Sequence, residues 1–90
     1  SASVRLVVSG NPFGTKDALK SRGYRWNSDA VHWAKIIPED QLSDEAEWLQ
    51  TSIYAGESKV IETELLDAYN RYSNRPGVRS TLSLRPLAAN

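Results

Sequence analysis

Short runs of β-branched and aromatic residues, partly alternating with polar ones, predict three β-strands in the first half of the chain. They cover residues 4–8, 24–26 and 31–37. The last two are separated only by Asn27-Ser28-Asp29-Ala30, a four-residue segment of turn-forming composition. We therefore expect residues 24–37 to form a tight β-hairpin.

A four-residue turn would also fix how the two hairpin strands pair. Trp26 would lie opposite Val31, and Arg25 would lie opposite His32. Because side chains alternate between the faces of a strand, the aromatic residues fall together on one face and pack in the core. That face would carry Tyr24, Trp26, Val31 and Trp33, and the other would carry Arg25, His32, Ala34 and Ile36.

A first helix is predicted over residues 16–22. Thr15 precedes it and can offer its hydroxyl to a free amide of the first turn, while Gly23 suits the left-handed conformation that ends many helices. Only Ala18 and Leu19 are apolar in this segment. The helix must therefore depend on the rest of the domain for its stability.

A second helix is predicted to begin after Pro38 and to end near Gly56. Its apolar residues recur at helical spacing and form one stripe, which consists of Leu42, Ala46, Leu49 and Ile53. The acids between them are expected on the solvated side opposite this stripe, namely Asp44, Glu45 and Glu47.

Beyond Gly56 the pattern predicts a strand over residues 59–63 that runs into a short helix, since Ile61, Leu65, Tyr69 and Tyr72 match a helical face. The fold class is therefore α+β, with a small, mostly antiparallel sheet and two helices in the order β-α-β-β-α-β plus a C-terminal extension. We expect residues 1–73 to form the compact domain and residues 74–90 to form a tail that is either flexible or clasped against it.

Composition narrows the class of protein. The chain has 90 residues, a net charge of zero and no cysteine, which excludes disulfides and thiolate metal sites. A single histidine, His32, excludes a multi-histidine metal site. These features fit a cytoplasmic domain without a membrane span. The opening Ser1-Ala2-Ser3 suggests that the parent protein extends further.

The neutral total hides blocks of opposite charge. Residues 16–35 carry five Lys or Arg side chains against two acids, whereas residues 36–67 carry nine acids and one lysine. Four arginines and no acid follow residue 67. Such blocks either present a local field to a charged partner or neutralise one another.

The run KDALKSRGYRWN, a Trp-bearing strand after it and the helix that ends EWLQTSIY resemble the C-terminal accessory domain of bacterial proofreading-type 3′–5′ exonucleases. These are the DEDD nucleases related to the epsilon subunit of the replicative polymerase. The resemblance covers roughly residues 4–73, and its most specific part is Arg22-Gly23-Tyr24-Arg25-Trp26. His32-Trp33 departs from the family, which often has two adjacent aromatic residues there.

The resemblance implies a nucleic-acid-binding accessory domain that positions DNA for a nuclease carried elsewhere on the parent chain. The residues expected to contact DNA are Lys16, Lys20, Arg22 and Arg25 at phosphates, with His32 and Tyr24 at sugar or base. Under the competing interpretation, the lysines are only solvated and Arg22 pairs with an acid. The alternative function is a protein–protein interaction module that tethers the parent nuclease to a polymerase or clamp through the acidic helix or residues 79–87.

No catalytic site is predicted in this chain. Metal-dependent exonucleases need about three or four carboxylates around two metal ions, and no such constellation appears in the sequence. The chain also lacks a nucleophile elbow and a phosphate-binding lysine loop. We expect no cofactor in this chain, and a divalent metal only in the parent nuclease domain. The expected partner is DNA, single- or double-stranded, bound without sequence specificity.

Overall fold

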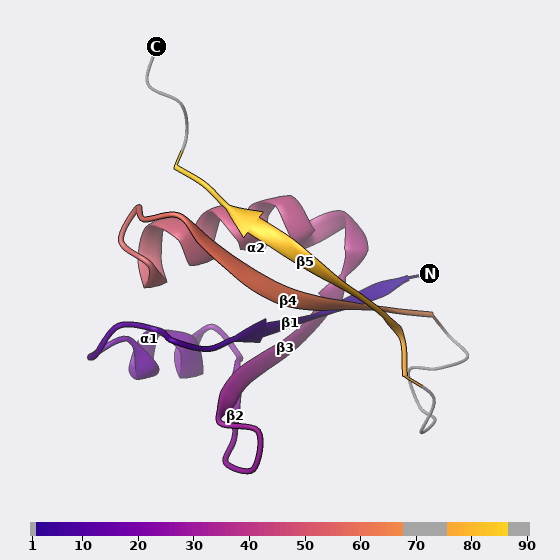
Figure 1. Cartoon of the computed structure of the whole chain (residues 1–90), viewed down its shortest axis with the longest axis horizontal. Coiled ribbons are helices and arrows are strands. Elements are labelled where there is room, and N and C mark those ends of the chain that lie inside the picture. Colours follow the sequence, from indigo (N-terminus) through magenta and orange to yellow (C-terminus); the bar gives the residue numbers. More distant parts are fainter. Residues whose placement is uncertain (1, 68–75, 87–90) are drawn as a thin grey trace.

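The computed structural model describes residues 2–67 and 76–86, which form one antiparallel five-stranded sheet packed against helices (Figure 1). The predicted α+β class and the order β-α-β-β-α-β are confirmed, and one further strand, β5, follows. The elements are β1 (Ser3–Val8), α1 (Lys16–Ser21), β2 (Arg25–Asn27), β3 (His32–Pro38), η1 (Glu39–Gln41), α2 (Leu42–Trp48), η2 (Leu49–Ile53), β4 (Lys59–Leu66) and β5 (Val78–Leu84).

The strands lie in the spatial order β2-β3-β1-β4-β5. The first strand of the chain is thus the centre of the sheet, and it pairs antiparallel with β3 on one side and β4 on the other. The short β2 and the longer β5 form the two edges. This order places the predicted hairpin at one edge and the C-terminal strand at the opposite edge.

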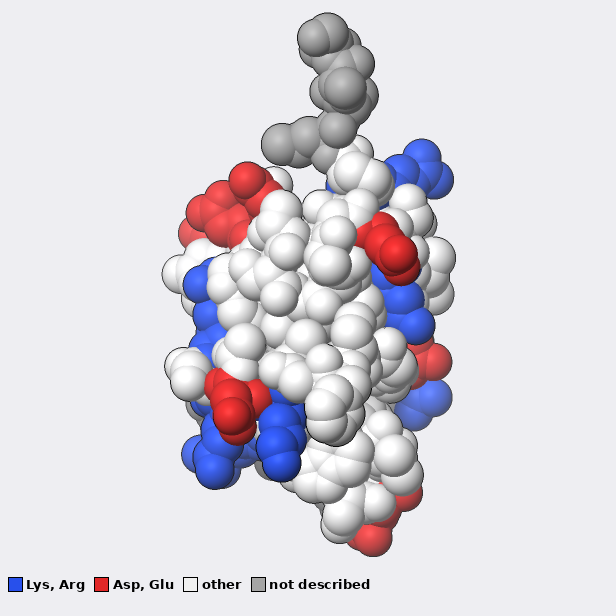
Figure 2. Space-filling model, turned by 90° about the vertical axis from the view of Figure 1, so that its left-hand side faces the viewer, with Lys and Arg blue, Asp and Glu red and all other residues white. Residues whose placement is uncertain are grey.

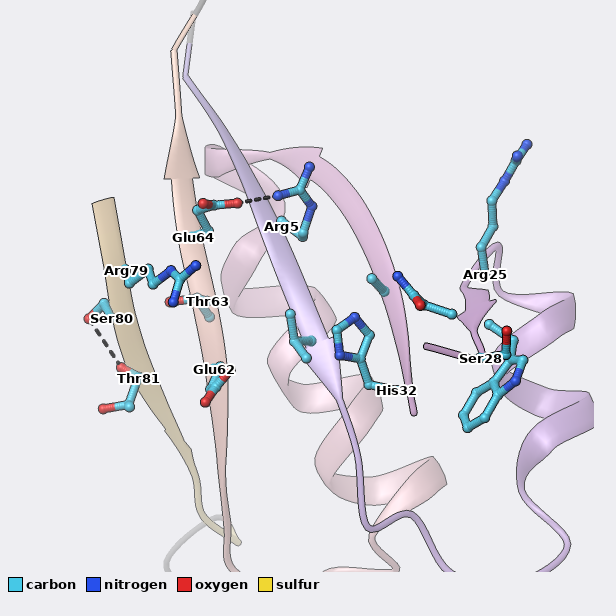
Figure 3. A pocket seen from close by; sticks show the side chains of 14 residues that line it. Arg5, Arg25, Ser28, His32, Glu62, Thr63, Glu64, Arg79, Ser80 and Thr81 are labelled. Carbon is cyan, nitrogen blue, oxygen red and sulfur yellow. Dashed lines mark hydrogen bonds and ion pairs between the residues drawn. The ribbon is translucent and has the colours of Figure 1, made fainter. Parts of the chain in front are cut away.

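Helices cover one face of this sheet, and the core lies between the two layers (Figures 1 and 3). Leu6 and Val8 of β1 are fully buried, and they belong to one apolar cluster with Leu19 of α1 and with Leu49 and Ile53 of η2. The described part of the chain places no helix on the other face, which we call the open face. It carries Arg5, Val7, Arg25, Asn27, His32, Ala34, Glu62, Glu64, Arg79 and Thr81.

The β2–β3 hairpin forms, but its register differs from the predicted one. Trp26 lies opposite Trp33, and Asn27 lies opposite His32. The turn therefore spans residues 28–31, and Val31 adopts a left-handed conformation with φ of 57°. Because the shift is two residues, the side chains that remain in the strands keep their predicted faces. Val31 does not, because it lies in the turn and is 64% exposed, so the expectation that it shares the aromatic face is wrong.

The aromatic residues of the hairpin divide between core and surface. Tyr24, just before β2, is buried, and Trp33 is partly buried against the core. Trp26 remains 50% exposed, so the expectation that it packs in the core is wrong. The physical reason is its place on the edge strand, where its ring leans on Trp33, which is itself only partly buried.

Both ends of α1 are near their predicted positions. Gly23 has φ of 100°, as expected for the residue that ends the helix. Thr15 stands at the N-cap, but its hydroxyl caps no amide. It donates instead to the carbonyl of Pro12 and accepts a hydrogen bond from Asn11, so the hydroxyl stabilises the preceding turn.

The second helical segment runs from Glu39 to Ile53 and changes geometry on the way. It begins as a 3₁₀ turn, continues as the α-helix α2 and ends as the π-helical η2. The predicted stripe does face the core, but Glu45 lies in it and is only 4% exposed. The expectation that Glu45 is solvated is therefore wrong, whereas Asp44 and Glu47 are exposed as predicted.

The last two described strands replace what was predicted as a strand running into a helix. β4 stays extended through Leu66, so Leu65 is not helical, and Tyr69 and Tyr72 lie outside the described residues. Residues 78–84 of the expected tail form β5, which pairs along β4 from Val78 to Leu84.

Candidate nucleic-acid interface

A buried carboxylate connects the second helical segment to the segment between α1 and β2. One oxygen of Glu45 accepts from Arg22 Nε at 3.2 Å and from Arg22 Nη2 at 3.0 Å, while the other accepts from Tyr24 Oη at 2.7 Å. Arg22 also lies over the Trp48 ring, 4.6 Å from its centroid, and Trp48 stacks on Tyr24. These contacts satisfy a charge that would otherwise be costly to bury.

Burial and the hydrogen bond to Glu45 raise the pKa of Tyr24 well above its usual value of 10.0. Burial also raises the pKa of Tyr54, whose hydroxyl donates to the carbonyl of Ser9. Both phenols therefore hold their protons more tightly in the folded state than in the unfolded chain.

This difference makes the domain sensitive to alkali. Above about pH 10 the unfolded chain releases the Tyr24 proton while the folded chain keeps it, so the free energy of unfolding falls as pH rises, by up to ~1.4 kcal/mol per pH unit. Below that pH the contribution is complete. Urea unfolding at several pH values above about 10 measures how steeply the free energy of unfolding falls with pH. The fall should be less steep for Tyr24→Phe than for wild type, and Tyr54 should account for part of the fall that remains. Equal slopes would contradict the assignment.

Two of the predicted contact residues, Arg22 and Tyr24, are thus engaged by the buried Glu45, although the Arg22 side chain stays partly exposed. Arg22 pairs with Glu45, and its backbone carbonyl accepts from Lys35 Nζ at 2.8 Å. Lys35 in turn lies over the Tyr24 ring. The acidic helix therefore neutralises one basic residue of the expected surface, which is the competing interpretation for Arg22.

The two predicted lysines remain at the surface. Lys16 and Lys20 occupy the first and fifth positions of α1, and both are exposed. Neither forms an ion pair with another described residue. They lie on the helical side of the sheet, apart from the open face.

Arg25 and His32 lie on the open face and line its broad, shallow hollow (Figure 3). Asn27 and Ser28 adjoin them on the side of β2, and Arg79 lines the hollow from β5. Within the described ranges, Arg25 and Arg79 make no ion pair. The β2 and β3 side of the hollow therefore offers cationic and polar groups to a ligand, and Arg79 stands at the opposite margin.

The centre and the β4 side of the hollow carry a different charge pattern. Arg5 of β1 pairs with Glu64 of β4, as Figure 3 shows, and Glu64 also accepts from the backbone amide of Gly77. Glu62 is exposed on the same strand. An anionic ligand is therefore favoured over β2 and β3 and opposed over β4.

The basic side chains do not form one continuous surface on the face shown in Figure 2. On the side of the molecule seen in Figure 2, lysines and arginines form separate groups at the two margins, with acids among them and uncharged residues between. Of the six residues predicted to contact DNA, the structure brings Arg25 and His32 to the open face, leaves Lys16 and Lys20 on α1, and turns Arg22 and Tyr24 inward.

Sequence reasoning missed two residues of this surface. Arg79 could not be placed because β5 was not recognised as a strand, although Thr81 to Leu84 alternates briefly. Trp26 was assigned to the core because its face was known but its edge position was not. The signal for that position was the length of β2, since three residues are few for a central strand.

Two further observations concern the residues 2–67 and 76–86. No three His, Asp or Glu side chains among them gather closely enough to hold a metal ion. No helix in these segments has the length and apolar character needed to cross a membrane.

Comparison with protein-family models, with curated proteins and with solved structures finds no match to this chain.

Proposed function

We propose that this chain is a non-catalytic nucleic-acid-binding domain that positions DNA for a 3′–5′ exonuclease domain of its parent protein. The exonuclease connection rests on the resemblance of residues 4–73. The DNA-binding role rests on one observation, which is the set of cations at the β2 side of the sheet that have no acidic partner among the described residues. Arg25 and Lys20 are its principal members.

The chemistry of this set suits phosphate more than other ligands. Arginine and lysine side chains at a surface contact the backbone of nucleic acids without reading its sequence. Asn27, Ser28 and His32 add hydrogen-bonding groups beside Arg25. The resulting affinity would be unspecific and would weaken steeply with salt as counterions are released.

The acidic side chains of the open face determine where a nucleic acid can run, because they repel phosphates. Glu62 and the Arg5–Glu64 pair occupy the centre and β4 side of the open face. A phosphate chain is expected to avoid them and to run along β2 and β3. Arg79 then makes at most a peripheral contact, because β5 is at the opposite edge.

Charge reversal at Arg25 is the direct experiment. We expect Arg25→Glu to weaken binding of a labelled DNA oligonucleotide roughly tenfold, since it removes one phosphate contact and adds a repelling charge. Fluorescence anisotropy at about 50 mM and about 200 mM salt measures the dissociation constants and their salt dependence.

Arg85→Glu is the matched control, because it makes the same change in net charge just after β5, at the opposite edge of the sheet. It should alter the dissociation constant far less. Equal losses in the two variants would show that only net charge matters. Absence of any binding by the wild type at the lower salt would refute the proposed function.

One observation favours the alternative, a protein–protein interaction module that tethers the parent nuclease. In the described part of the chain, β5 is the last strand of the sheet and no other strand pairs with its outer edge. Such an edge can accept an extended peptide as a further strand. A wild-type domain that binds neither single-stranded nor double-stranded DNA would leave this function as the better supported one.

A further inference from the structure

Trp26 is the most exposed large aromatic ring in the hairpin, and its position is fixed from behind. Its ring leans on Trp33 with a centroid distance of 5.4 Å and an interplanar angle of 55°. Trp33 itself packs against the core cluster. Half of the Trp26 surface is nevertheless open. The indole is therefore held in place and at the same time available to a ligand.

The short strand that carries Trp26 separates two hollows. The first is the hollow of the open face, and the second is a smaller one on the helical side. Arg25 and Trp26 line both of them. The second hollow is completed by Lys20, Gly23, Tyr24 and Trp33. We call this strand, with the exposed side chains of Arg25 and Trp26, the β2 ridge.

A cation stands on each side of the β2 ridge. Arg25 belongs to the open face, and Lys20 reaches the second hollow from α1. Neither makes an ion pair within residues 2–67 and 76–86. Their neighbours Arg22 and Lys35 are engaged by Glu45 and by a backbone carbonyl. Among the described residues, Arg25 and Lys20 are thus the cations beside the β2 ridge that remain available to an external anion.

We propose that the β2 ridge binds an unpaired nucleotide of a single-stranded nucleic acid. The base stacks on the open side of the Trp26 ring, and the phosphates on either side of it contact Lys20 and Arg25. This proposal deepens the proposed function and rests on it. It names the class of nucleic acid and the residue that selects it.

The geometry separates single strands from duplexes. In a duplex the faces of the bases are covered by their neighbours, so no base can lie on Trp26 unless it is first unstacked, which costs free energy. A single strand can also turn over a ridge only three residues long, whereas a duplex is stiff over about 150 base pairs. Stacking uses the face that every base has, so little sequence preference follows.

Removal of the ring tests the proposal. We expect Trp26→Ala to weaken binding of a labelled oligothymidylate roughly tenfold and to leave binding of a duplex of equal length nearly unchanged. Trp26→Phe keeps a ring and should retain most of the affinity. Val60→Ala, which shortens another exposed apolar side chain far from the ridge, should change neither.

Intrinsic fluorescence provides a second readout. Stacking should quench the emission of the wild type on titration with oligothymidylate, and Trp26→Phe should lose most of that quenching while Trp33 and Trp48 still emit. Urea unfolding of each variant verifies that the domain remains folded. Lys20→Glu should also weaken single-strand binding.

The outcomes separate this inference from the proposed function. If Trp26→Ala binds single strand and duplex as the wild type does, or weakens both equally, the stacking site is refuted while DNA binding through Arg25 stands. If the wild type binds no nucleic acid, the proposed function fails and this inference fails with it. Quenching that survives in Trp26→Phe would also refute the site.

Discussion

Replacing Glu45 by alanine should lower the free energy of unfolding by about 3 kcal/mol. The side chain is buried, and it accepts hydrogen bonds from Tyr24 and from Arg22. Its removal leaves the hydroxyl of Tyr24 buried without a partner, which costs about 1–3 kcal/mol. The loss of the ion pair adds less than a fully buried pair would, because Arg22 is partly exposed and therefore screened by solvent.

Two further variants make the Glu45 experiment specific. Glu47→Ala removes an exposed carboxylate from the same helix, and we expect it to change the free energy of unfolding by no more than about 0.5 kcal/mol. Glu45→Gln keeps an oxygen that can accept from Tyr24, so its loss in the free energy of unfolding should lie between those of Glu45→Ala and Glu47→Ala. Urea unfolding followed by tryptophan fluorescence measures all three. An equal cost for Glu45→Ala and Glu47→Ala would contradict the role given to the buried carboxylate.

Replacing Leu19 by alanine should cost about 3 kcal/mol, within the range usual for a fully buried leucine. Leu19 is the only buried residue of α1 and is completely enclosed by the core cluster. Its carbonyl also accepts from the amide of Tyr24 at 3.0 Å, so the residue connects α1 to the start of β2. A six-residue helix has little stability of its own, so it depends on this contact.

The Leu19 variant has a matched control in Leu65→Ala. Leu65 of β4 is 39% exposed, and the same truncation there should cost less than about 1 kcal/mol. Hydrogen exchange should also show that the amides of α1 lose protection before those of β1 in Leu19→Ala. Equal costs for the two truncations, or uniform loss of protection, would show that α1 does not depend on this one leucine.

Most of the architecture followed from local pattern. The strand over residues 4–8, the helix ending at Gly23 and the hairpin each showed their own periodicity or turn residues. Apart from Val31, the faces of the hairpin were also correct, because a register shift of two residues preserves them. These features depend on neighbouring residues in the chain, which is why the sequence alone could predict them.

The features that sequence reasoning missed depend on contacts between distant segments. Glu45 is a charged residue at a position that faces the core, and its burial is possible because Arg22 and Tyr24 reach it from 23 and 21 residues away. β5 forms because β4 offers it a free edge. Trp26 stays exposed because β2 is an edge strand. None of these partners could be assigned from the pattern near the residue itself.

The candidate interface also combines features that local sequence predicts with features that depend on contacts between distant segments. The sequence pointed to the basic segment around the hairpin, and Arg25, His32 and Lys20 do lie near β2. Which of its cations stay available was decided by the acidic helix, which binds Arg22 and leaves Lys20 and Arg25 without an acidic partner among the described residues. That selection is a tertiary effect.

The position of β1 in the middle of the sheet has a consequence for biosynthesis. Among the five strands of the sheet it is synthesised first, yet one of its two neighbours, β4, is completed only at Leu66. Until then Leu6 and Val8 lack part of the apolar cluster that encloses them. Pairings that span so much of the chain form slowly compared with local ones. The nascent domain must therefore wait, with an apolar strand accessible to chaperones, until β4 has been translated.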